Sequence, residues 1–242
     1  MADHEEYIGD RTRLYVIGDI HGRADLLDQM VEKIALDMRQ YPGPECLTVT
    51  LGDYIDRGPD SSGVLDRLAR NPFPTNYVAL KGNHEWLLES FMHDPSIGHY
   101  WRKLGGLETI HSYRVPVEAL MTGQGFAGAC EALKLVMPNE HLRFLGSLKT
   151  SLTIGKFFLC HAGVRPGVSL QRQNVDDLLW IREEFLTSTM NFGKVVIHGH
   201  SPNEWPEVRP NRINIDTGAF ATGRLTCLVV EDEGAPRFLF TA

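Results

Sequence analysis

Apolar residues follow two alternating spacings along the first part of the chain. Short apolar runs typical of buried strands occur at residues 14–17, 46–51 and 77–80. Each run is followed by apolar residues three and four positions apart, over residues 23–38, 59–69 and 86–92. That spacing gives a helix one apolar face that can pack on a sheet. The repeated order of strand and helix predicts an α/β fold whose parallel strands are joined by right-handed crossovers.

The remainder of the chain changes pattern twice. Residues 94–148 have a helical and less regular pattern, and apolar positions there, such as Trp101, are typical of core packing. We expect this segment to be a helical insertion beside the functional site, within one domain that spans residues 1–242. Strand-like runs return at residues 151–154, 157–160, 195–197, 213–215, 225–230 and 237–240. We expect the last three runs to form antiparallel strands.

The composition is that of a globular protein with enough apolar residues for a sizeable core. The chain has 242 residues, of which 43% are hydrophobic and 23% are charged, as in one large α/β domain or two small ones. A formal charge of −7 argues against a broad surface for nucleic acid or for an anionic membrane. We therefore expect neither partner, and any recognition of phosphate must be local.

Cysteine usage and the start of the chain bear on location. The four cysteines lie far apart without a Cys-x-x-Cys pair, which is typical of buried free thiols in a reducing compartment. Residues 1–7 are acidic where a signal peptide would be basic and then apolar, and no apolar stretch reaches bilayer length. These features predict a cytoplasmic protein.

Side chains able to bind a metal follow five of the apolar runs. They are Asp19 with His21, Asp53, Asn83 with His84, His161, and His198 or His200. Because parallel strands share a carboxyl-end edge, we expect these groups to gather on one edge of the sheet. Asp19 and His21 are two positions apart, so both would point to the same side of an extended backbone.

The types of donor indicate which metals could bind and how many. Carboxylate, imidazole and amide oxygen together suit Mn, Fe or Zn better than a metal that prefers thiolates. About six ligands exceed the need of one catalytic ion with an open position. Two ions roughly 3.5–4 Å apart, bridged by one carboxylate, would use them all, and Asp53 is the candidate bridge. The alternative is that Asp53 and Asp56 cap a helix or turn and Arg57 pairs with one of them, and that each histidine is a hydrogen-bonded core or loop residue.

Three glycine-flanked blocks carry a resemblance to a known family. They are Gly-Asp-Ile-His-Gly at residues 18–22, Gly-Asp-Tyr-Ile-Asp-Arg-Gly at 52–58 and Gly-Asn-His-Glu at 82–85. Shorter blocks follow: His-Ala-Gly at 161–163, Trp-Ile-Arg-Glu at 180–183, Gly-His-Ser-Pro at 199–202 and Asp-Thr-Gly at 216–218. Together they resemble the phosphoprotein phosphatases, the metal-dependent serine/threonine phosphatases among the calcineurin-like metallophosphoesterases, and most of all their bacterial and phage branch. The resemblance implies a central mixed β-sandwich flanked by helices, with a βαβαβ metal-binding core and a helical insertion at about 94–148.

The resemblance also implies a role for each metal-binding candidate. The first ion would be held by Asp19, His21 and Asp53, and the second by Asp53, Asn83, His161 and His200. The spacing of residues leaves His198 and His200 open as ligands. The family pattern Gly-His-Ser/Thr-Pro favours His200, with His198 as a neighbouring support residue. Two divalent ions are implied, with Mn expected and Zn or Fe as alternatives.

Other residues would act on the substrate. The candidates for binding the phosphate are Arg57, Asn83 and Arg182. A guanidinium is permanently charged and can donate two parallel hydrogen bonds, although a surface pair of Arg182 with Glu183 or Glu184 is the alternative. The resemblance makes His84 the general acid to the leaving alkoxide, oriented by Asp56. A hydroxide that bridges the two ions would attack phosphorus directly, without a phosphoenzyme.

The function that we predict is a serine/threonine protein phosphatase, a phosphomonoesterase that acts on phosphorylated proteins or small phosphoesters. The alternatives are a hydrolase of dinucleoside polyphosphates such as diadenosine tetraphosphate, and an inactive metal-binding regulatory protein. Relatives that hydrolyse dinucleoside polyphosphates typically carry Ala-Arg-Gly where this chain has Asp-Arg-Gly at residues 56–58. An inactive relative would be expected to lack a ligand, and every ligand type is present. Lys81 stands where the family usually has arginine, which leaves the choice of substrate open.

Overall fold

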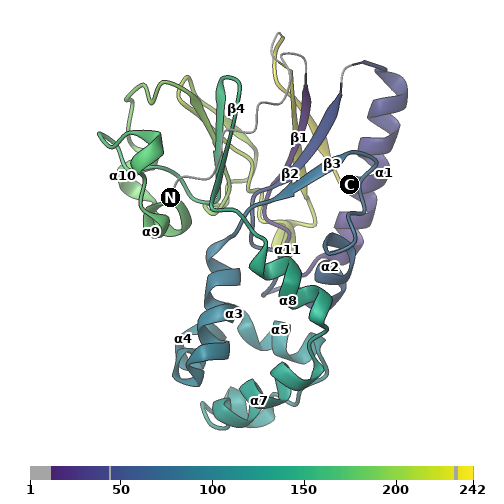
Figure 1. Ribbon diagram of the computed structural model, residues 1–242, viewed down its shortest axis with the longest axis vertical. Coiled ribbons are helices and arrows are strands. Elements are labelled where there is room, and N and C mark those ends of the chain that lie inside the picture. The colour runs from purple at the N-terminus through teal and green to yellow at the C-terminus, as the bar shows by residue number, and fades with distance from the viewer. Residues whose placement is uncertain (1–11, 44, 232–233, 242) are drawn as a thin grey trace.

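Two five-stranded sheets form the centre of the molecule (Figure 1). The computed structural model describes residues 12–43, 45–231 and 234–241. The acidic start of the chain, on which the predicted location partly depends, lies outside the described residues. Among the helices that are described, none is long and apolar enough to cross a membrane.

The first sheet contains the three parallel strands that the sequence predicts. They are β1 (Arg13–Ile17), β2 (Cys46–Thr50) and β3 (Asn76–Ala79). On the other side of β1 lie the antiparallel strands β9 (Thr226–Val230) and β10 (Arg237–Phe240). The crossovers contain α1 (Ala24–Gln40) and α2 (Ser61–Leu68). The side chain of Asp60 caps α2 by accepting a hydrogen bond from the N–H of Gly63.

The second sheet is built from the later strands. Its members are β4 (Ser151–Ile154), β5 (Phe157–Cys160), β6 (Val195–His198), β7 (Glu207–Val208) and β8 (Arg212–Asn214), in the spatial order β4-β5-β6-β8-β7. The prediction of an antiparallel strand at residues 213–215 is wrong with respect to β6, because β8 pairs with β6 in parallel. The antiparallel partner of β8 is β7, whose two residues are too few to give a periodic signal. The antiparallel prediction for β9 and β10 is confirmed.

Side chains along β1 alternate between two apolar cores. Leu14 and Val16 pack into the core that joins the sheets, together with residues of β5, β6 and β8. Tyr15 and Ile17 point the other way, into the core that contains α1 and α2. A third core joins the outer face of the second sheet to α9 (Val175–Trp180) and α10 (Glu183–Leu186). The layers confirm a mixed β-sandwich flanked by helices.

Helices occupy the segment in which the sequence predicts a helical insertion. They are α4 (Gly98–Trp101), α5 (Gly106–Ser112), α6 (Glu118–Met121), α7 (Phe126–Val136) and α8 (Asn139–Gly146). With α3 (Asn83–His93), which precedes them, they lie beyond the end of the first sheet, in the lower part of Figure 1. The pattern predicts a third helix from Trp86, but α3 begins at Asn83. Asn83 and His84 therefore lie in the first turn of a helix, where the backbone direction is fixed.

Candidate metal centre

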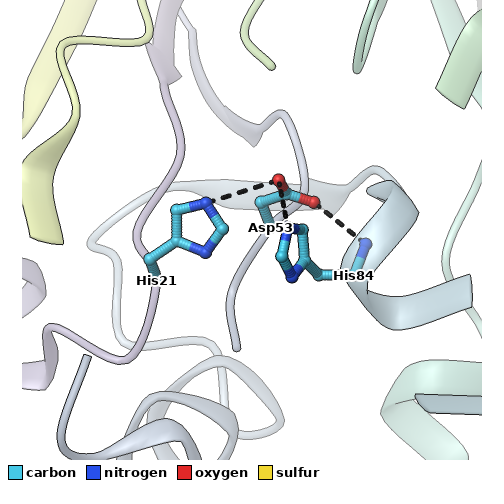
Figure 2. A group of neighbouring side chains, drawn as sticks. All are labelled: His21, Asp53 and His84. Carbon is cyan, nitrogen blue, oxygen red and sulfur yellow. Dashed lines mark hydrogen bonds and ion pairs between the residues drawn. The ribbon is translucent and has the colours of Figure 1, made fainter. Parts of the chain in front are cut away.

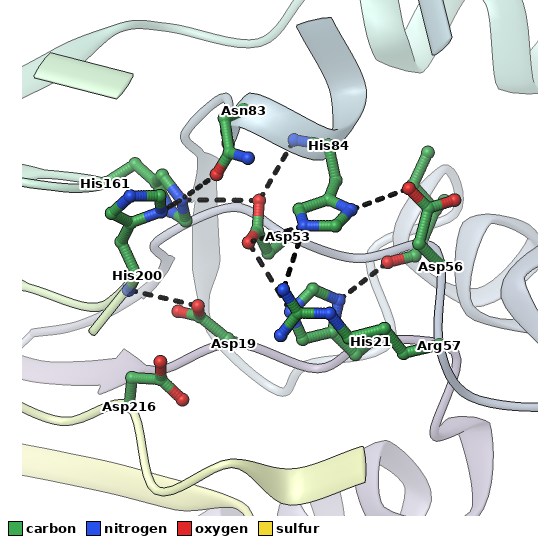
Figure 3. A network of polar contacts seen from close by, with 12 residues as sticks. Asp19, His21, Asp53, Asp56, Arg57, Asn83, His84, His161, His200 and Asp216 are labelled. Atoms are coloured by element: carbon green, nitrogen blue, oxygen red, sulfur yellow. Dashed lines mark hydrogen bonds and ion pairs between the residues drawn. The ribbon is translucent and has the colours of Figure 1, made fainter. Parts of the chain in front are cut away.

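The six predicted metal ligands come together at one place (Figure 3). They are Asp19, His21, Asp53, Asn83, His161 and His200, and each is at most 5% exposed. The expectation that they share one edge of one sheet is wrong, because β1 and β2 belong to the first sheet and β5 and β6 to the second. The carboxyl ends of strands from both sheets converge, and the first turn of α3 supplies the remaining ligand.

Asp53 lies at the centre of the cluster and faces two groups of histidines (Figure 3), of which His21 and His84 are drawn in Figure 2. Its Oδ1 is 3.3 Å from Nε2 of His161. Its Oδ2 is 3.5 Å from Nε2 of His21 and 3.7 Å from Nε2 of His84. The two oxygens of one carboxylate thus face two separate groups of possible ligands, an arrangement that suits a bridging ligand.

The group around Oδ1 of Asp53 has the donor set of a complete metal site. Nε2 of His161 lies 2.9 Å from Oδ1 of Asn83 and 3.2 Å from Nδ1 of His200. Ligands about 2.1 Å from a tetrahedral ion are about 3.4 Å from one another, so these spacings are near those of a metal shell. Two oxygens and two imidazole nitrogens suit Mn, Fe or Zn.

The group around Oδ2 of Asp53 contains the candidate ligand His21 and the candidate acid His84, and Asp19 lies outside it. His21, Asp53 and His84 offer donor atoms that lie within 4.8 Å of one another. Oδ2 of Asp19 accepts a hydrogen bond from the N–H of His200, whereas Oδ1 of Asp19 is buried without a hydrogen-bond partner. A Cβ on Gly199 would lie 2.0 Å from that Oδ1, so only glycine leaves room for it. An orphaned buried carboxylate oxygen fits a cation.

Hydrogen bonds from the imidazole rings orient two of the ligands. Nδ1 of His21 lies 2.8 Å from the carbonyl oxygen of Ile55, and Nδ1 of His161 lies 3.0 Å from that of Leu51. Each Nδ1–H donates to a carbonyl, which leaves the Nε2 lone pair free for a metal. Burial and the neighbouring His84 lower the pKa of His21 to about 3, and burial and His161 lower the pKa of His200 to about 2. Both rings are therefore held in the neutral form that binds metals.

Buried carboxylates give the centre an excess of negative charge. Burial, together with the charges of Asp216 and Asp53, raises the pKa of Asp19 well above its usual value. Burial also raises the pKa of Asp216 to about 6. For Asp53, burial is outweighed by His161, His84 and His21, so its pKa is lowered. Burying several carboxylates is costly unless cations balance them, so the charge balance also fits metal ions.

The backbone around the centre is held in unusual conformations. Seven described residues other than glycine have positive φ, and five of them are candidate site residues: His21 (46°), Asp53 (52°), Asp56 (71°), Arg57 (67°) and His200 (64°). Such conformations persist only where surrounding contacts enforce them, and they concentrate at functional sites. The extended-backbone argument for Asp19 and His21 is wrong, because β1 ends at Ile17 and His21 is left-handed.

Glu85 supports Asp53, the candidate bridging ligand, and the sequence argument gave Glu85 no role. Its fully buried carboxylate accepts hydrogen bonds of 2.8–2.9 Å from the backbone N–H groups of Gly82, Asp53 and Tyr54. Glu85 is also the third residue of α3, where a glutamate that reaches back to the N-cap forms a capping box. A glutamate three positions after the N-cap Gly82 is the sequence signal that could have identified Glu85.

Asp56 forms a buried pair with His84. Its Oδ2 accepts hydrogen bonds from Nδ1 of His84 and from Nε1 of Trp101, both at 2.6 Å. Its Oδ1 accepts one from Oγ1 of Thr109 at 2.5 Å. Burial lowers the pKa of His84, but Asp53 and Asp56 outweigh burial, so the pKa is raised. A protonated imidazole is thereby favoured beside the cluster, and two donors from the helical insertion hold its carboxylate partner.

The basic candidates differ in their surroundings. Nη2 of Arg57 lies 3.5 Å from Nε2 of His84, so this guanidinium borders the cluster. Exposed Arg182 donates to Oγ of Ser201, which adjoins His200, at 3.3 Å. Glu184, proposed as an alternative partner of Arg182, pairs instead with Arg165.

The side chains of Lys81 and His198 contact residues other than the candidate ligands. Both carboxylate oxygens of Glu89 accept from Nζ of Lys81 at 2.8 Å. Buried His198 packs edge-on against Phe185, with ring centroids 4.9 Å apart. Among the described residues, His198 does not belong to the groups that could hold a metal.

Comparison with known proteins shows a match over most of the chain. The profile of the calcineurin-like phosphoesterase family matches residues 12–227. Serine/threonine-protein phosphatase 2 of Escherichia coli is 28% identical over 222 residues, covering 88% of this chain and 90% of that protein. The asymmetrical bis(5'-nucleosyl)-tetraphosphatase PrpE of Halalkalibacterium halodurans is 25% identical over 231 residues, covering 88% of each chain.

Solved structures share the fold at lower identity. A crystal structure provisionally described as a diadenosine tetraphosphatase has a TM-score of 0.63 and 20% identity, covering 94% of this chain and 93% of that one. The cold-active protein-tyrosine phosphatase of a psychrophilic Shewanella has a TM-score of 0.54 and 15% identity, covering 96% and 82%.

Proposed function

Because the chain belongs to the calcineurin-like phosphoesterase family, we propose that it is a metal-dependent phosphatase that acts on phosphorylated serine and threonine in proteins. The observation that carries this proposal is the buried pair of Asp56 and His84 beside the ligand cluster. A serine or threonine alkoxide is a poor leaving group that needs a proton, and this pair is built to supply one. The Escherichia coli relative named as a serine/threonine phosphatase supports the same substrate class.

In this proposal two divalent ions occupy the cluster. Asp19, His21 and Asp53 hold the first, and Asp53, Asn83, His161 and His200 hold the second. The ions, most simply Mn, supply acidification of water and neutralisation of charge on the phosphate oxygens. The orphaned Oδ1 of Asp19 supports these assignments, as do the Nδ1–H hydrogen bonds that turn the Nε2 lone pairs of His21 and His161 toward the cluster.

The remaining site residues act on the substrate directly. Arg57 and Arg182, with Asn83, bind the phosphoryl oxygens, since each guanidinium can donate two parallel hydrogen bonds. His84 donates the proton on Nε2 to the leaving oxygen. Asp56 keeps Nδ1 protonated throughout and stabilises the imidazolium before transfer. No side chain needs to become phosphorylated, so quenching a single turnover should trap no phosphoprotein.

Hydrolysis of dinucleoside polyphosphates is the second candidate function. The observation that favours it is the similarity to PrpE, at nearly the same identity as to the protein phosphatase. A nucleotide is a much better leaving group than an alkoxide, so this reaction has less need of the Asp56–His84 pair. The buried pair therefore supports the phosphomonoesterase over the polyphosphatase.

One assay separates the candidates. The protein is stripped of metal and reloaded separately with Mn, Zn, Fe or Mg. Each form is tested on phosphoserine peptides, p-nitrophenyl phosphate and diadenosine tetraphosphate. We expect Mn-dependent release of phosphate from the peptides. Turnover of diadenosine tetraphosphate alone would overturn the proposal, and no turnover with any metal would indicate a non-catalytic metal-binding protein.

A further inference from the structure

A cavity of about 480 Å³ lies next to the proposed catalytic centre. It is lined by residues 22–25 at the start of α1, residues 57–60 before α2, and Phe220 of α11 (Ala219–Thr222). The carbonyl oxygen of Ala219, at the start of α11, accepts a hydrogen bond of 3.1 Å from Nη1 of Arg23, which brings α11 to the start of α1. None of the roles proposed above accounts for Phe220, Arg23 or Asp25.

Arg57 lines the cavity and also borders the proposed catalytic centre. One side of its guanidinium meets the general acid, with Nη2 3.5 Å from Nε2 of His84. On the other side, its Cζ lies 4.8 Å from the centroid of the Phe220 ring. The ring of His21 packs edge-on against both His84 and Phe220, at 4.7 Å and 5.4 Å. The cavity is therefore separated from the atom that would protonate the leaving oxygen by the guanidinium of Arg57 alone, so the groups that extend beyond the leaving oxygen can reach it.

The charges of the lining side chains select the kind of leaving group. Arg23 is neutralised by Asp25, which accepts from its Nε and Nη2 at 2.8 Å and 2.6 Å. The lining contains two arginines and two aspartates in all, so the negative charge of Asp60 balances the positive charge of Arg57. Once Arg57 binds the phosphoryl group, the remaining lining carries a net negative charge. A polyphosphate is then repelled, while a neutral or basic side chain is accepted, with Phe220 as an aromatic surface for it.

We propose that this cavity is the leaving-group subsite, and that it binds the residue next to the phosphorylated serine or threonine through a neutral or basic side chain. The proposal rests on the proposed function and deepens it, because it names which peptides are preferred. Phe220 provides the contact surface, and the Arg23–Asp25 pair keeps the cavity from attracting anions.

The test uses three phosphoserine peptides that differ only in the flanking residue, which is Lys, Gly or Glu on both sides. The Mn-loaded protein should have kcat/KM values in the order Lys, Gly, Glu. Asp25→Asn frees the charge of Arg23 and should reduce the ratio of the Lys to the Glu peptide about five- to tenfold, as expected for one charge about 7 Å away at a partly screened site. Phe220→Ala should remove most of the difference between the Lys and Gly peptides, even if the lost contact with Arg57 slows all three.

A matched control comes from the same helix. Asp28 makes an equally bidentate and exposed pair with Arg67, outside the cavity, at 2.6 Å and 2.7 Å. Asp28→Asn should leave the ratio of Lys to Glu peptide unchanged. Diadenosine tetraphosphate is assayed in parallel with each variant.

Two results would overturn the subsite, and they differ in what they mean. If Asp25→Asn and Phe220→Ala change all three peptides by the same factor, the cavity does not bind the flanking residue, although phosphopeptide turnover leaves the proposed function standing. If the unchanged protein prefers diadenosine tetraphosphate and Asp25→Asn accelerates it further, the cavity accepts an anionic leaving group, and both proposals are wrong.

Discussion

Replacing Asp56 with asparagine tests whether the buried carboxylate–imidazole pair protonates the leaving group. Asp56 is fully buried and its Oδ2 is 2.6 Å from Nδ1 of His84. An asparagine of nearly the same shape can still accept the Nδ1 proton, but it carries no charge. Its amide NH₂ can face Oγ1 of Thr109, which can accept a hydrogen bond as well as donate one. The change therefore removes the charge beside the imidazolium while retaining the contacts.

The size of the effect follows from the role of the acid. Loss of a general acid costs roughly 10²–10⁴ in rate, which we expect for kcat of His84→Asn on a phosphoserine peptide. Asp56→Asn keeps the imidazole, so it should cost less, about 10- to 100-fold. That loss equals about 1.4–2.7 kcal/mol, the usual contribution of one hydrogen bond to a charged group. An aryl oxide leaves without a proton, so both variants should lose less than about tenfold on p-nitrophenyl phosphate.

Steady-state rates of the Mn-loaded variants on both substrates provide the assay. Because Asp56 acts through His84, the double variant should be no slower than His84→Asn alone. Asp66→Asn is the matched control, since Asp66 lies 3.1 Å from Nε2 of His141 in another carboxylate–imidazole pair. It should leave both rates within about twofold. Equal losses on the two substrates, or additive losses in the double variant, would refute the role of the pair.

Other parts of the structure give further predictions. Trp101→Phe removes one donor to the carboxylate partner of His84 and should lower kcat about three- to tenfold for phosphopeptides, but within about twofold for aryl phosphates. Glu85→Gln places an amide against backbone N–H groups and should lower the free energy of unfolding in urea by about 2–3 kcal/mol. Burial raises the pKa of Asp37, but hydrogen bonds from Arg237 and Tyr15 outweigh it and lower the pKa. The stabilisation by Asp37 is therefore full above the unfolded carboxyl pKa of about 3.9 and is lost as pH falls through the lower pKa of the folded state. Urea unfolding of Asp37→Asn should differ most from that of the unchanged protein near pH 7, and the two should approach each other as pH falls below about 4. Chelation should lower the melting temperature, and Mn at about 100 times its Kd should restore about 2.7 kcal/mol.

The sequence could predict the residues of the cluster because strand ends leave a clear signal. Hydrophobic periodicity locates the carboxyl ends of β1, β2, β5 and β6, and polar side chains at those ends are few. The assignment of the strands to one sheet was wrong, because periodicity does not state which strands are hydrogen-bonded to one another. The ligands still converge, since the strand ends of both sheets meet at the shared core.

Contacts between distant segments could not be predicted. Trp101 and Thr109 reach Asp56 across 45 and 53 residues. A tryptophan in an apolar stripe has the same pattern whether or not its ring N–H meets a buried carboxylate, so Trp101 was interpreted as packing alone. The left-handed backbone of His21 and His200 also leaves no signal, because tertiary contacts and not the residue type enforce it.

The segment of residues 53–58 links the metal cluster to the acid and is held from three directions. Glu85 accepts hydrogen bonds from the N–H groups at its start, and two donors of the helical insertion hold Asp56. At its end, Gly58 packs so closely that a Cβ there would lie 2.0 Å from the carbonyl oxygen of His21. The insertion thus contacts the proposed acid pair, and Glu85 contacts the candidate bridging ligand. If Asp56 and His84 act as proposed, changes in the insertion should alter protonation of the leaving group before they alter metal binding, and they should lower the rate on alkyl esters more than on aryl esters.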